Sequence, residues 1–519
     1  MTMKRLLLLL FLPVFLPALT LARDVRVTTA PELRAAINSA LPGDVITLAT
    51  GTYAITSKLS CTAAGTSALP IIVRGEVPFG ATLESNTLIA IGVSAPFWRF
   101  EDFVMRGICA NDSDCEHAFQ VTGLGTDVVL RRLRLVDFNA QLKVNATAAG
   151  DGGYDMPHRG LVEACEVFDT RPRATANPVT KLNIDTGDDF VVRDNFIHDF
   201  AKNGGNFISY GSFMKSGGRR GLYERNLVLC RSGGQAMTDT RIGLSLGGGG
   251  TAPQFCYPGF DAAIPCSVEH ADGVLRNNII ANCSDVGVYL NRARNTSVLH
   301  NTLVGTNGVD FRFDTTTGRA VGNLLTSTIR ARDLGTFADT QNVTGVTVPE
   351  FVAAYANPLA GDLSVTGAVA AWVGVVTPPS GVTDDYCART RTSARWTVGA
   401  LEHSLGSCAT GKPPDGGMGG GGGSATGGGS ATGGGSATGG GSATGGGSAT
   451  GGGSATGGGS ATGDGSSPDG GVEPGPVRGC GCVSLEGVGG ALALALLSRR
   501  RRSPRAEVRS RSGEAARGR

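Results

Sequence analysis

The sequence predicts an all-β protein whose body, residues 23–405, is a single-stranded right-handed parallel β-helix of about ten coils. A short motif, Asn followed by apolar residues, recurs at a spacing of just over twenty residues in its later copies, too short for separate domains. Coils of that size bury an apolar face only by stacking, with strands paired about 4.8 Å apart. No 3.6-residue apolar period accompanies the motif, which disfavours leucine-rich and helical repeats. The motif copies are Asn195, Asn226, Asn278, Asn301 and Asn323.

Asn at one fixed coil position has a physical use. Its side chain can bond the coils above and below, and Asn tolerates the left-handed turn at the end of a strand. We therefore expect a stacked Asn ladder through the later coils.

The beginning of the body predicts a cap for the open end of the stack. Residues 29–37 place Pro31 and Glu32 in the first turn of a short amphipathic helix, with Leu33 and Ile37 on one face. A strand follows at 45–48. Without such a cap the first coil would expose apolar core and free strand edges.

Earlier coils are longer than later ones. Strands are expected near 100–103, 133–136 and 165–168, at steps of about thirty residues, and another at 241–246. The additional residues of the longer coils must form loops that project from the stack. Long loops on a rigid scaffold commonly carry function. The sequence therefore places the candidate site in the N-terminal half. Residues 384–402 are expected to close the body.

The two ends predict export. Residues 1–22 combine Lys4 and Arg5 with an apolar run, as a signal peptide does. Residues 406–478 contain a Gly-Gly-Gly-Ser-Ala-Thr repeat that cannot bury a core, so a disordered linker is expected. Residues 479–503 hold Cys480 and Cys482, a short apolar stretch expected to form an anchor helix, and an Arg cluster; residues 504–519 are a basic tail.

The segment from Cys480 to about Arg502 resembles the MYXO-CTERM sorting signal of myxobacterial surface proteins. That resemblance implies processing near the cysteines and display on the cell surface, anchored at the outer membrane through the C-terminus. Similarly, residues 385–402 resemble the Asp-x-x-Gly-x-x-Arg…Gly-Ala-x-Glu ending of many secreted β-helix proteins, with Ala388 in place of the usual Gly.

Charge and cysteine content agree with an extracellular role. The net charge of +2 conceals a tail with nine Arg and two Glu at 499–519. Without that tail and the leader cations the body is mildly acidic, at about −7, which argues against a nucleic-acid partner. Ten cysteines lie between Cys61 and Cys408. The spacing predicts local disulfides Cys109–Cys115 and Cys256–Cys266 and allows Cys387–Cys408, while Cys165, Cys230 and Cys283 are either bonded or packed thiols.

Lys215 and Ser216 lie before a motif strand, inside the predicted β-helix. This pair resembles the chondroitinase-B and alginate lyase family of pectin-lyase-like proteins, which cleave acidic polysaccharides by β-elimination. The resemblance implies that Lys215 is the base. Such chemistry needs a neutralised uronate carboxylate, a base for the C5 proton and a proton donor for O4.

Arginines near Lys215 could lower its pKa and hold the carboxylate. Arg241 is the candidate second catalytic residue, and Arg219, Arg220, Asn206 and Tyr210 are the candidate substrate-binding residues. The sequence departs from the family, because its Glu-x-Glu calcium ligands fall on Ile208 and Tyr210 and its Leu-Thr-Leu-Arg-His-Gly segment reads Leu-Ser-Leu-Gly at 244–247. For the lysine and the arginines, a solvated turn is the structural alternative.

Asp185, Asp188 and Asp189 are close enough in sequence to hold Ca²⁺, and turn capping is the alternative role for these carboxylates. No other cofactor is expected. The sequence thus predicts a surface-displayed monomer that binds, and in one hypothesis cleaves, an acidic polysaccharide. The alternative is a non-catalytic adhesin or glycan-binding protein.

Overall fold

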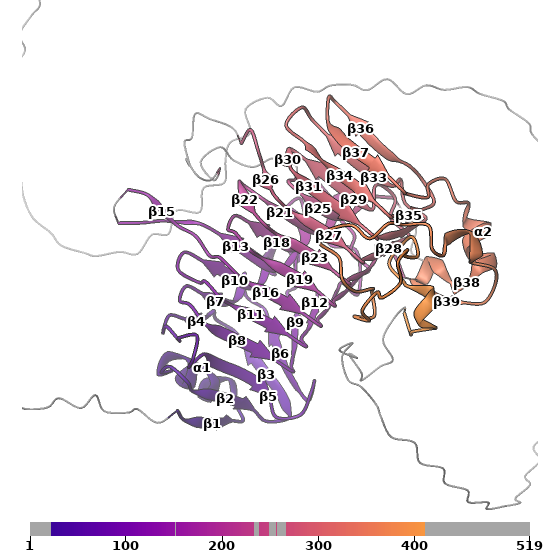
Figure 1. Cartoon of the computed structure of the whole chain (residues 1–519). Helices are drawn as coiled ribbons and strands as arrows, with labels where there is room; N and C mark the ends of the chain where they lie inside the picture. The colour runs from indigo at the N-terminus through magenta and orange to yellow at the C-terminus, as the bar shows by residue number, and fades with distance from the viewer. Residues whose placement is uncertain (1–21, 151, 233–237, 249–255, 257–265, 411–519) are drawn as a thin grey trace, which may run out of the picture. The chain divides into compact units, whose positions relative to one another are not determined.

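The computed structural model describes residues 22–150, 152–232, 238–248, 256 and 266–410 of the 519-residue chain. These residues form a parallel β-helix in which three long parallel sheets follow the stack of coils (Figure 1), confirming the predicted fold class. The predicted signal peptide, the anchor segment, the basic tail and the linker beyond residue 410 lie outside the described residues. Within the described part, no helix combines the length and apolarity that a membrane crossing requires.

Sheet A has twelve strands, each paired in parallel with its neighbour. In spatial order they are β1 (Asp24–Val27), β2 (Val45–Leu48), β5 (Ile71–Gly75), β8 (Trp98–Glu101), β11 (Val129–Arg131), β16 (Leu161–Glu163), β19 (Val191–Arg193), β23 (Leu222–Glu224), β27 (Val274–Arg276), β31 (Thr296–Leu299), β34 (Thr317–Val321) and β37 (Thr336–Thr340).

Sheet B has ten strands and contains the predicted motif strands. They are β3 (Gly51–Ile55), β6 (Ala81–Ser85), β9 (Val104–Gly107), β12 (Arg134–Val136), β17 (Glu166–Phe168), β20 (Phe196–His198), β24 (Leu227–Leu229), β28 (Ile279–Ala281), β32 (Thr302–Val304) and β35 (Leu324–Leu325). One expected strand was wrong in detail, because Asp102 is a turn residue with a φ of 66° that separates β8 from β9.

Sheet C also has ten strands and carries the candidate site. They are β4 (Leu59–Cys61), β7 (Ile89–Val93), β10 (His117–Thr122), β13 (Ala140–Asn145), β18 (Val179–Asp185), β21 (Ile208–Lys215), β25 (Thr240–Leu246), β29 (Val288–Asn291), β33 (Val309–Arg312) and β36 (Ile329–Arg332).

Several short strands form small sheets outside the three long ones. β14 (Thr147–Ala148) and β15 (Tyr154–Asp155) form an antiparallel hairpin, and a parallel three-stranded sheet contains β22 (Gly218–Arg219), β26 (His270–Ala271) and β30 (Ala293–Arg294).

Inward-facing positions repeat in register and build one continuous core. Val144, Ile184, Met214 and Leu246 occupy equivalent positions on consecutive strands of sheet C, and all four are buried. Because equivalent coil positions are stacked, each apolar side chain contacts its equivalents in the coils above and below. The hydrophobic core therefore extends along the whole stack of coils. Outward positions on the same strands are thereby held at fixed spacing.

The predicted Asn ladder is present in sheet B. Each amide Nδ2 donates to the Oδ1 of the next ladder residue at 2.8–3.0 Å, from Asn195 to Asn342. The left-handed turn, however, is one residue earlier than expected. The residues with positive φ are Asp194, Arg225, Asn277, His300 and Gly322.

The predicted N-terminal cap is α1 (Ala30–Asn38). The Thr29 side chain accepts a hydrogen bond from the Glu32 backbone N–H at 3.3 Å, which begins the helix. Leu33, Ala36 and Ile37 are buried in the core of the first coils. The cap therefore covers apolar surface that the first coil would otherwise expose.

The C-terminal part of the body, residues 384–402, was expected to close the body, and the structure shows where this part of the chain packs. Segments after α2 (Val348–Ala354) fold back over the outer face of sheet B, where Trp372 and Trp396 pack with Leu227 and Ile279. The apolar outer residues of β24 and β28 need this cover because water would otherwise reach them. This part also contains β38 (Tyr355–Asn357) and β39 (Asp362–Val365).

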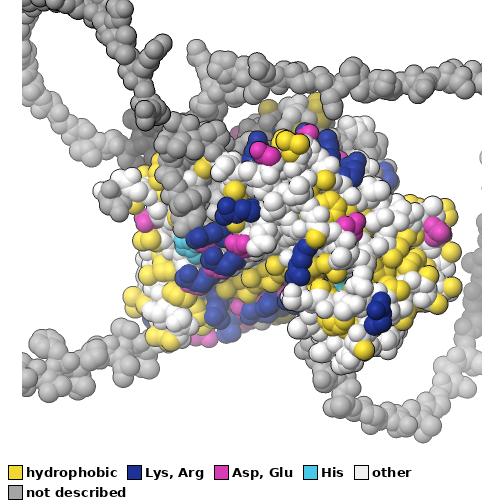
Figure 2. All heavy atoms as spheres, turned by 45° about the horizontal axis from the view of Figure 1, so that its top comes forward, with side chains coloured by type: hydrophobic (Ala, Val, Ile, Leu, Met, Phe, Trp, Pro, Cys, Tyr) yellow, Lys and Arg dark blue, Asp and Glu magenta, His cyan; other side chains and the backbone are white. Residues whose placement is uncertain are grey.

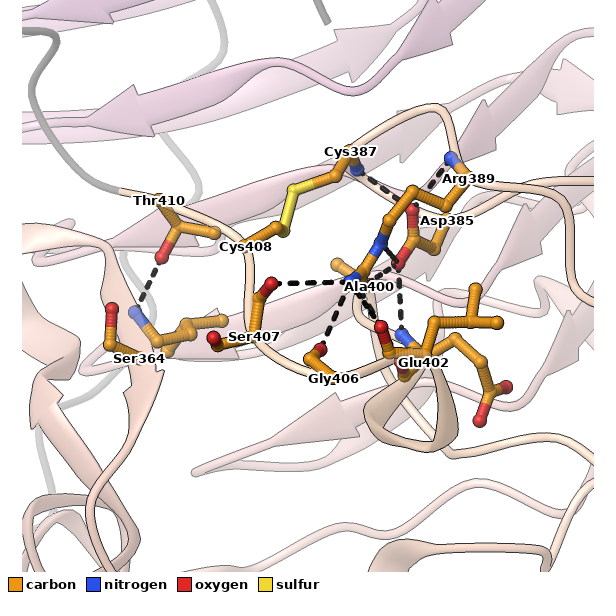
Figure 3. The surroundings of a disulfide bond; sticks show 12 residues. Ser364, Asp385, Cys387, Arg389, Ala400, Glu402, Gly406, Ser407, Cys408 and Thr410 are labelled. Atoms are coloured by element: carbon orange, nitrogen blue, oxygen red, sulfur yellow. Dashed lines mark hydrogen bonds and ion pairs between the residues drawn. A yellow bond between two sulfur atoms is a disulfide. The ribbon is translucent and has the colours of Figure 1, made fainter. Parts of the chain in front are cut away.

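Figure 3 shows how the terminal motif holds this segment. Asp385 accepts hydrogen bonds from the backbone N–H of Cys387 and Arg389, and from the Arg389 guanidinium at 2.6 Å. Ala388, at the position where Gly is usual, has a φ of 56°. Arg391 forms a buried ion pair of 3.1 Å with Glu402. The resemblance at this end therefore corresponds to a turn and a buried ion pair.

The cysteine expectations are largely confirmed. Cys109–Cys115, Cys256–Cys266 and Cys387–Cys408 are disulfides. Cys230 and Cys283, which were left open, form a fourth disulfide, whereas Cys61 and Cys165 are buried thiols.

Candidate functional site

A cavity of about 570 Å³ opens on the outer face of sheet C. Its floor is formed by β13, β18 and β21, and its wall by the segments that lead into β18 and β21. The side chains on the floor include Lys143, Asn183, Asp185, Tyr210, Phe213 and Lys215, and those of the wall include Ala176, Pro178, Lys202 and Asn206.

Two lysines on the cavity floor share one carboxylate. Lys143 Nζ lies 2.9 Å from Asp185 Oδ2, and Lys215 Nζ lies 3.8 Å from the same oxygen. Lys143 Nζ also donates to Asn183 Oδ1 at 3.0 Å. The other Asp185 oxygen accepts a hydrogen bond from the Ser216 hydroxyl. One buried carboxylate thus fixes two cationic side chains that come from different coils.

Strand register explains this arrangement. Asp185 on β18 is directly opposite Lys215 on β21, and Lys143 on β13 is opposite Asn183 on β18. Outward side chains on neighbouring parallel strands are about 4.8 Å apart, so they interact although tens of residues separate them in sequence.

Burial and charge compete in setting the pKa values here. Burial lowers the pKa of Lys143, and the Lys215 charge lowers it further, while Asp185 opposes both effects. Burial alone would raise the pKa of Asp185, but Lys143, Lys215 and the Ser216 hydroxyl outweigh it and hold that pKa well below its usual range. Asp185 is therefore a carboxylate at neutral pH, beside a lysine whose neutral form is easier to reach than in water.

The wall supplies a third lysine. Lys202 Nζ donates to Asn206 Oδ1 at 2.8 Å and to the Ala176 carbonyl at 3.0 Å, which ties the two wall segments together. Its pKa is lowered, chiefly by burial. The lining therefore carries three lysine amines and a single carboxylate among the residues that the structure describes.

A buried ion-pair network holds one wall segment of the cavity in place. Asp112 accepts a hydrogen bond from the Ala174 backbone N–H at 2.6 Å and pairs with Arg173 at 3.0 Å and Arg171 at 2.6 Å. Arg173 also donates to Asn139 Oδ1 at 3.0 Å. Because Asp112 and Arg173 are both buried, this network fixes the segment that leads to Ala176.

Aromatic rings complete the floor. Tyr210 and Phe213 meet edge to face with ring centroids 5.4 Å apart, and Lys215 Nζ lies 4.8 Å from the centre of the Phe213 ring. The cavity floor therefore combines an aromatic surface with a few cationic and amide groups, a combination that can fix the orientation of a bound small molecule.

The structure brings some of the predicted site residues together and separates others. Lys215, Asn206, Tyr210 and Asp185 line the cavity. Arg241 does not, because its side chain is buried and pairs with Asp239 at 2.9 Å and with the Cys230 carbonyl. The expected Arg241 contribution from a neighbouring coil is therefore not supported by its position.

Arg219 is the last residue of β22 and Arg220 directly follows it, so both lie shortly after Lys215 in the chain. Arg219 pairs with Asp188 at 2.7 Å and Arg220 with Asp189 at 2.7 Å. Neither arginine is among the cavity residues, so the cation beside Lys215 is Lys143 rather than these arginines.

The three aspartates of the calcium hypothesis are not brought to one point. Asp185 faces the lysines, while Asp188 and Asp189 accept bonds from the two arginines. In the described part of the chain, no group of three or more His, Cys, Asp or Glu side chains could hold a metal ion. These residues do not fit a calcium site.

Lys143 and Lys202 were missed in the sequence. Lys143 belongs to a strand of alternating polar and apolar residues, which marks it as outward-facing, but alternation does not reveal which other coil it meets. Lys202 lies in an irregular segment before β21, where no periodic pattern is available.

Charged side chains elsewhere on the body are largely matched with opposite charges. Figure 2 shows Lys and Arg side chains beside Asp and Glu side chains on one face. On sheet A, for example, Glu163 pairs with both Arg131 and Arg193. The excess of lysine in the cavity therefore contrasts with the paired charges of that sheet.

The architecture is shared with a pectate lyase. The chain superposes on the structure of pectate lyase Pel9A with a TM-score of 0.52 at 12% sequence identity, covering 73% of this chain and 96% of that one. A rhamnogalacturonan lyase also matches, with a TM-score of 0.41 at 11% identity, over 62% of this chain and 87% of that one. Neither a protein family nor a curated protein sequence matches the chain. The first likeness establishes a common β-helix fold.

Proposed function

We propose that this protein binds an acidic, uronate-containing polysaccharide in the sheet C cavity. The observation that carries the proposal is the presence of three lysine amines and one carboxylate in a single cavity. Asp185 in the cavity and Glu116 beside it, whose charge acts on Lys143 and Lys202, balance two of these three cations, so the remaining positive charge favours an anionic ligand. Asn183, Asn206 and the Tyr210 and Phe213 rings supply the amides and aromatic surface that a sugar needs.

The shared fold supports the same ligand class. Pectate lyase Pel9A is by its name an enzyme of an acidic polysaccharide, and it has the same β-helix architecture. The fold alone assigns no activity, since one fold serves many functions. The cavity lysines are therefore the main argument.

Cleavage by β-elimination is a second candidate function, favoured by the paired lysines. In this reaction a base removes the C5 proton, the C4–O4 bond breaks and a C4=C5 double bond forms. The departing O4 takes a proton from the newly protonated base or from water. One lysine in its neutral form could accept the C5 proton while the other, still charged, faces the uronate carboxylate. Burial is the main cause that lowers the pKa of Lys143, which makes the neutral form of this lysine easier to reach. Lys215 is the base that the family resemblance implies.

One assay separates binding from cleavage. The product of β-elimination absorbs in the ultraviolet, so pectate, alginate, chondroitin and bacterial exopolysaccharides can be screened spectrophotometrically, with binding measured in parallel by affinity electrophoresis. Binding without absorbance would support a glycan-binding protein or adhesin. Absorbance that disappears in Lys215→Ala or Lys143→Met would support a lyase. If none of these polyanions is bound, the proposed function is wrong.

Arg219→Ala is a matched control, because it removes a cation from the neighbouring strand β22 without touching the cavity lining. We expect it to bind like the wild type. An equal loss in Arg219→Ala and Lys215→Ala would indicate a diffuse charge effect instead of a site.

We further propose that the body is displayed on the cell surface by the sorting segment 479–503, which follows the linker 406–478. This proposal depends on the sequence pattern, and the four disulfides of the body agree with export to an oxidising compartment. Fusing the last forty residues to a secreted reporter should retain the reporter at the envelope, and Cys480→Ala with Cys482→Ala should release it. A reporter that stays soluble with the native cysteines would remove the proposal.

A further inference from the structure

The outer face of sheet C continues beyond the cavity toward the N-terminal cap. Lys143 on β13 is in register with Gln120 on β10, and Gln120 is in register with Gly92 on β7. Gln120 and Gly92 are both partly exposed. Figure 1 shows these strands succeeding one another between the cavity strands and α1.

Lys58 lies across this face at its far end. A Cβ added to Gly92 would come within 3.2 Å of Lys58 Cδ, so the lysine stem rests on the bare backbone of β7. The position of Lys58 is held by Arg34 of the cap helix, whose guanidinium donates to the Lys58 and Ser57 carbonyls at 2.8 and 2.7 Å. Lys58 itself is exposed. The absence of a side chain at Gly92 is what lets the lysine lie flat over the sheet.

The strands between Lys58 and the cavity carry no negative charge. β4, β7, β10 and β13 contain no Asp or Glu. A polyanion crossing these strands would meet amides and hydroxyls, including Gln120, Asn145 and Thr122, with a cation at either end. The carboxylates that flank the strands in the chain are Glu116, directly before β10, and Asp155 on β15, and both are partly exposed. Sheet A differs, because its outward carboxylates and guanidiniums alternate and pair.

In the opposite direction the same face is closed. Phe213 is in register with Ser245 on β25 and then with Tyr289 on β29, and both of those residues are buried. Tyr210, Ile242, Val286 and Tyr289 form an apolar cluster there. A bound chain that emerged from the cavity on this side would have to displace packed apolar side chains.

We propose that the polysaccharide leaves the cavity toward the N-terminal cap, crosses Gln120, and makes its outermost contact with Lys58. This inference rests on the proposed function and adds a direction and a length to it. From β21 to β7 there are four strand spacings, roughly 19 Å at about 4.8 Å each. A 1,4-linked sugar residue is comparable in length with the spacing between two neighbouring strands. A ligand that contacts both the cavity lysines and Lys58 must therefore be an oligomer several sugar residues long.

Calorimetric titration with galacturonate and mannuronate trimers and hexamers tests the proposal on the full chain. We expect the hexamer to bind more tightly than the trimer. Lys58→Ala should weaken hexamer binding about threefold, in the range of one exposed ion pair, and leave trimer binding unchanged. Lys58→Arg should keep the wild-type difference. Arg74→Ala, an exposed cation on β5 of sheet A, should change neither affinity.

Each other outcome is decisive. Equal affinities of the wild type for trimer and hexamer, or a hexamer affinity unaffected by Lys58→Ala, would overturn the extended contact while leaving the cavity proposal intact. An equal loss for both oligomers would mean that Lys58 acts on the cavity itself and would also overturn it. Failure of the wild type to bind any of the oligomers would overturn the proposed function together with this inference.

Discussion

Lys143 on β13 and Asp185 on β18 form a 2.9 Å ion pair in the cavity, although 42 residues separate them in the chain. Asp185 is also the carboxylate that faces Lys215, at 3.8 Å. The pair is nearly buried, with 14% of the Lys143 side chain and 11% of the Asp185 side chain exposed. Removing the Asp185 carboxylate therefore leaves the charges of the two lysines poorly solvated.

Asp185→Asn should destabilise the protein by about 3 kcal/mol, because a buried lysine pair loses its counter-charge. Urea denaturation followed by circular dichroism measures this change. Asp333→Asn is the matched control, since Asp333 pairs with Arg312 on the surface and is about half exposed. Similar small effects in both variants would show that the Asp185 pair does not stabilise the fold. A double variant with Lys143→Met should recover part of the lost stability.

His198 should make the stability depend on pH. Its ring is stacked between Phe168 and Phe196, with centroids 4.6 and 4.1 Å away, and bonds to Asp199 at 2.7 Å and Glu166 at 3.2 Å. Burial opposes its charge, but the two carboxylates outweigh burial and raise the pKa of His198 above its usual 6.5. Its contribution to stability is then complete below pH about 6.5 and is lost as the pH rises through the folded-state value.

The comparison with His198→Gln isolates this effect. The free energy of unfolding of the wild type should exceed that of the variant at pH about 6 and approach it at pH about 9. Glu166 also bonds Arg134 and Asp199 also bonds Ser232, so both carboxylates keep partners throughout. Nuclear magnetic resonance titration of the imidazole provides a direct check. A pKa at or below 6.5 would contradict the prediction.

The fold could be predicted from the sequence because the later coils repeat a local pattern. Asn followed by apolar residues marks the start of the last five strands of sheet B, from β20 to β35, and the structure places those strands in one parallel sheet. The left-handed residue was assigned one position too late because Asn tolerates that conformation, whereas the actual turn residues include Arg225 and His300. Backbone stacking imposes the turn there, and residue propensity does not.

Long-range placement was harder to obtain. The aromatic residues Phe351, Trp372 and Trp396 indicate an apolar surface in the C-terminal part of the body. Their sequence positions do not predict whether they cover sheet B or the end of the stack. The cavity has the same difficulty. Lys215 was found through a local motif, whereas Lys143 and Lys202 join it only because parallel register and loop packing bring their coils together.

Removing one residue from the middle of the Asn ladder should be costly. The Asn278 Oδ1 accepts from both the backbone N–H and the Nδ2 of Asn226, and its own Nδ2 donates to the Tyr223 carbonyl and to Asn301. Asn278→Ala leaves these buried groups without partners, so we expect a loss of about 3 kcal/mol in unfolding free energy. Asn342→Ala, at the partly exposed end of the ladder, should lose clearly less. Equal losses in chemical denaturation would argue against a cooperative ladder.

Ala388 offers a stabilising substitution at the C-terminal turn. Its φ of 56° is unfavourable for a residue with a Cβ, at a cost of about 1–2 kcal/mol, while Gly adopts it freely. Gly also adds about 0.4–1 kcal/mol of unfolded-state entropy, so Ala388→Gly should stabilise the protein by roughly 0.5–1 kcal/mol. Ala400→Gly is the control, because Ala400 is buried beside the same motif and has no positive φ; it should destabilise. Thermal unfolding of the two variants gives opposite shifts if the strain at Ala388 is real, and a destabilised Ala388→Gly would show that the surrounding bonds to Asp385 hold this turn without strain.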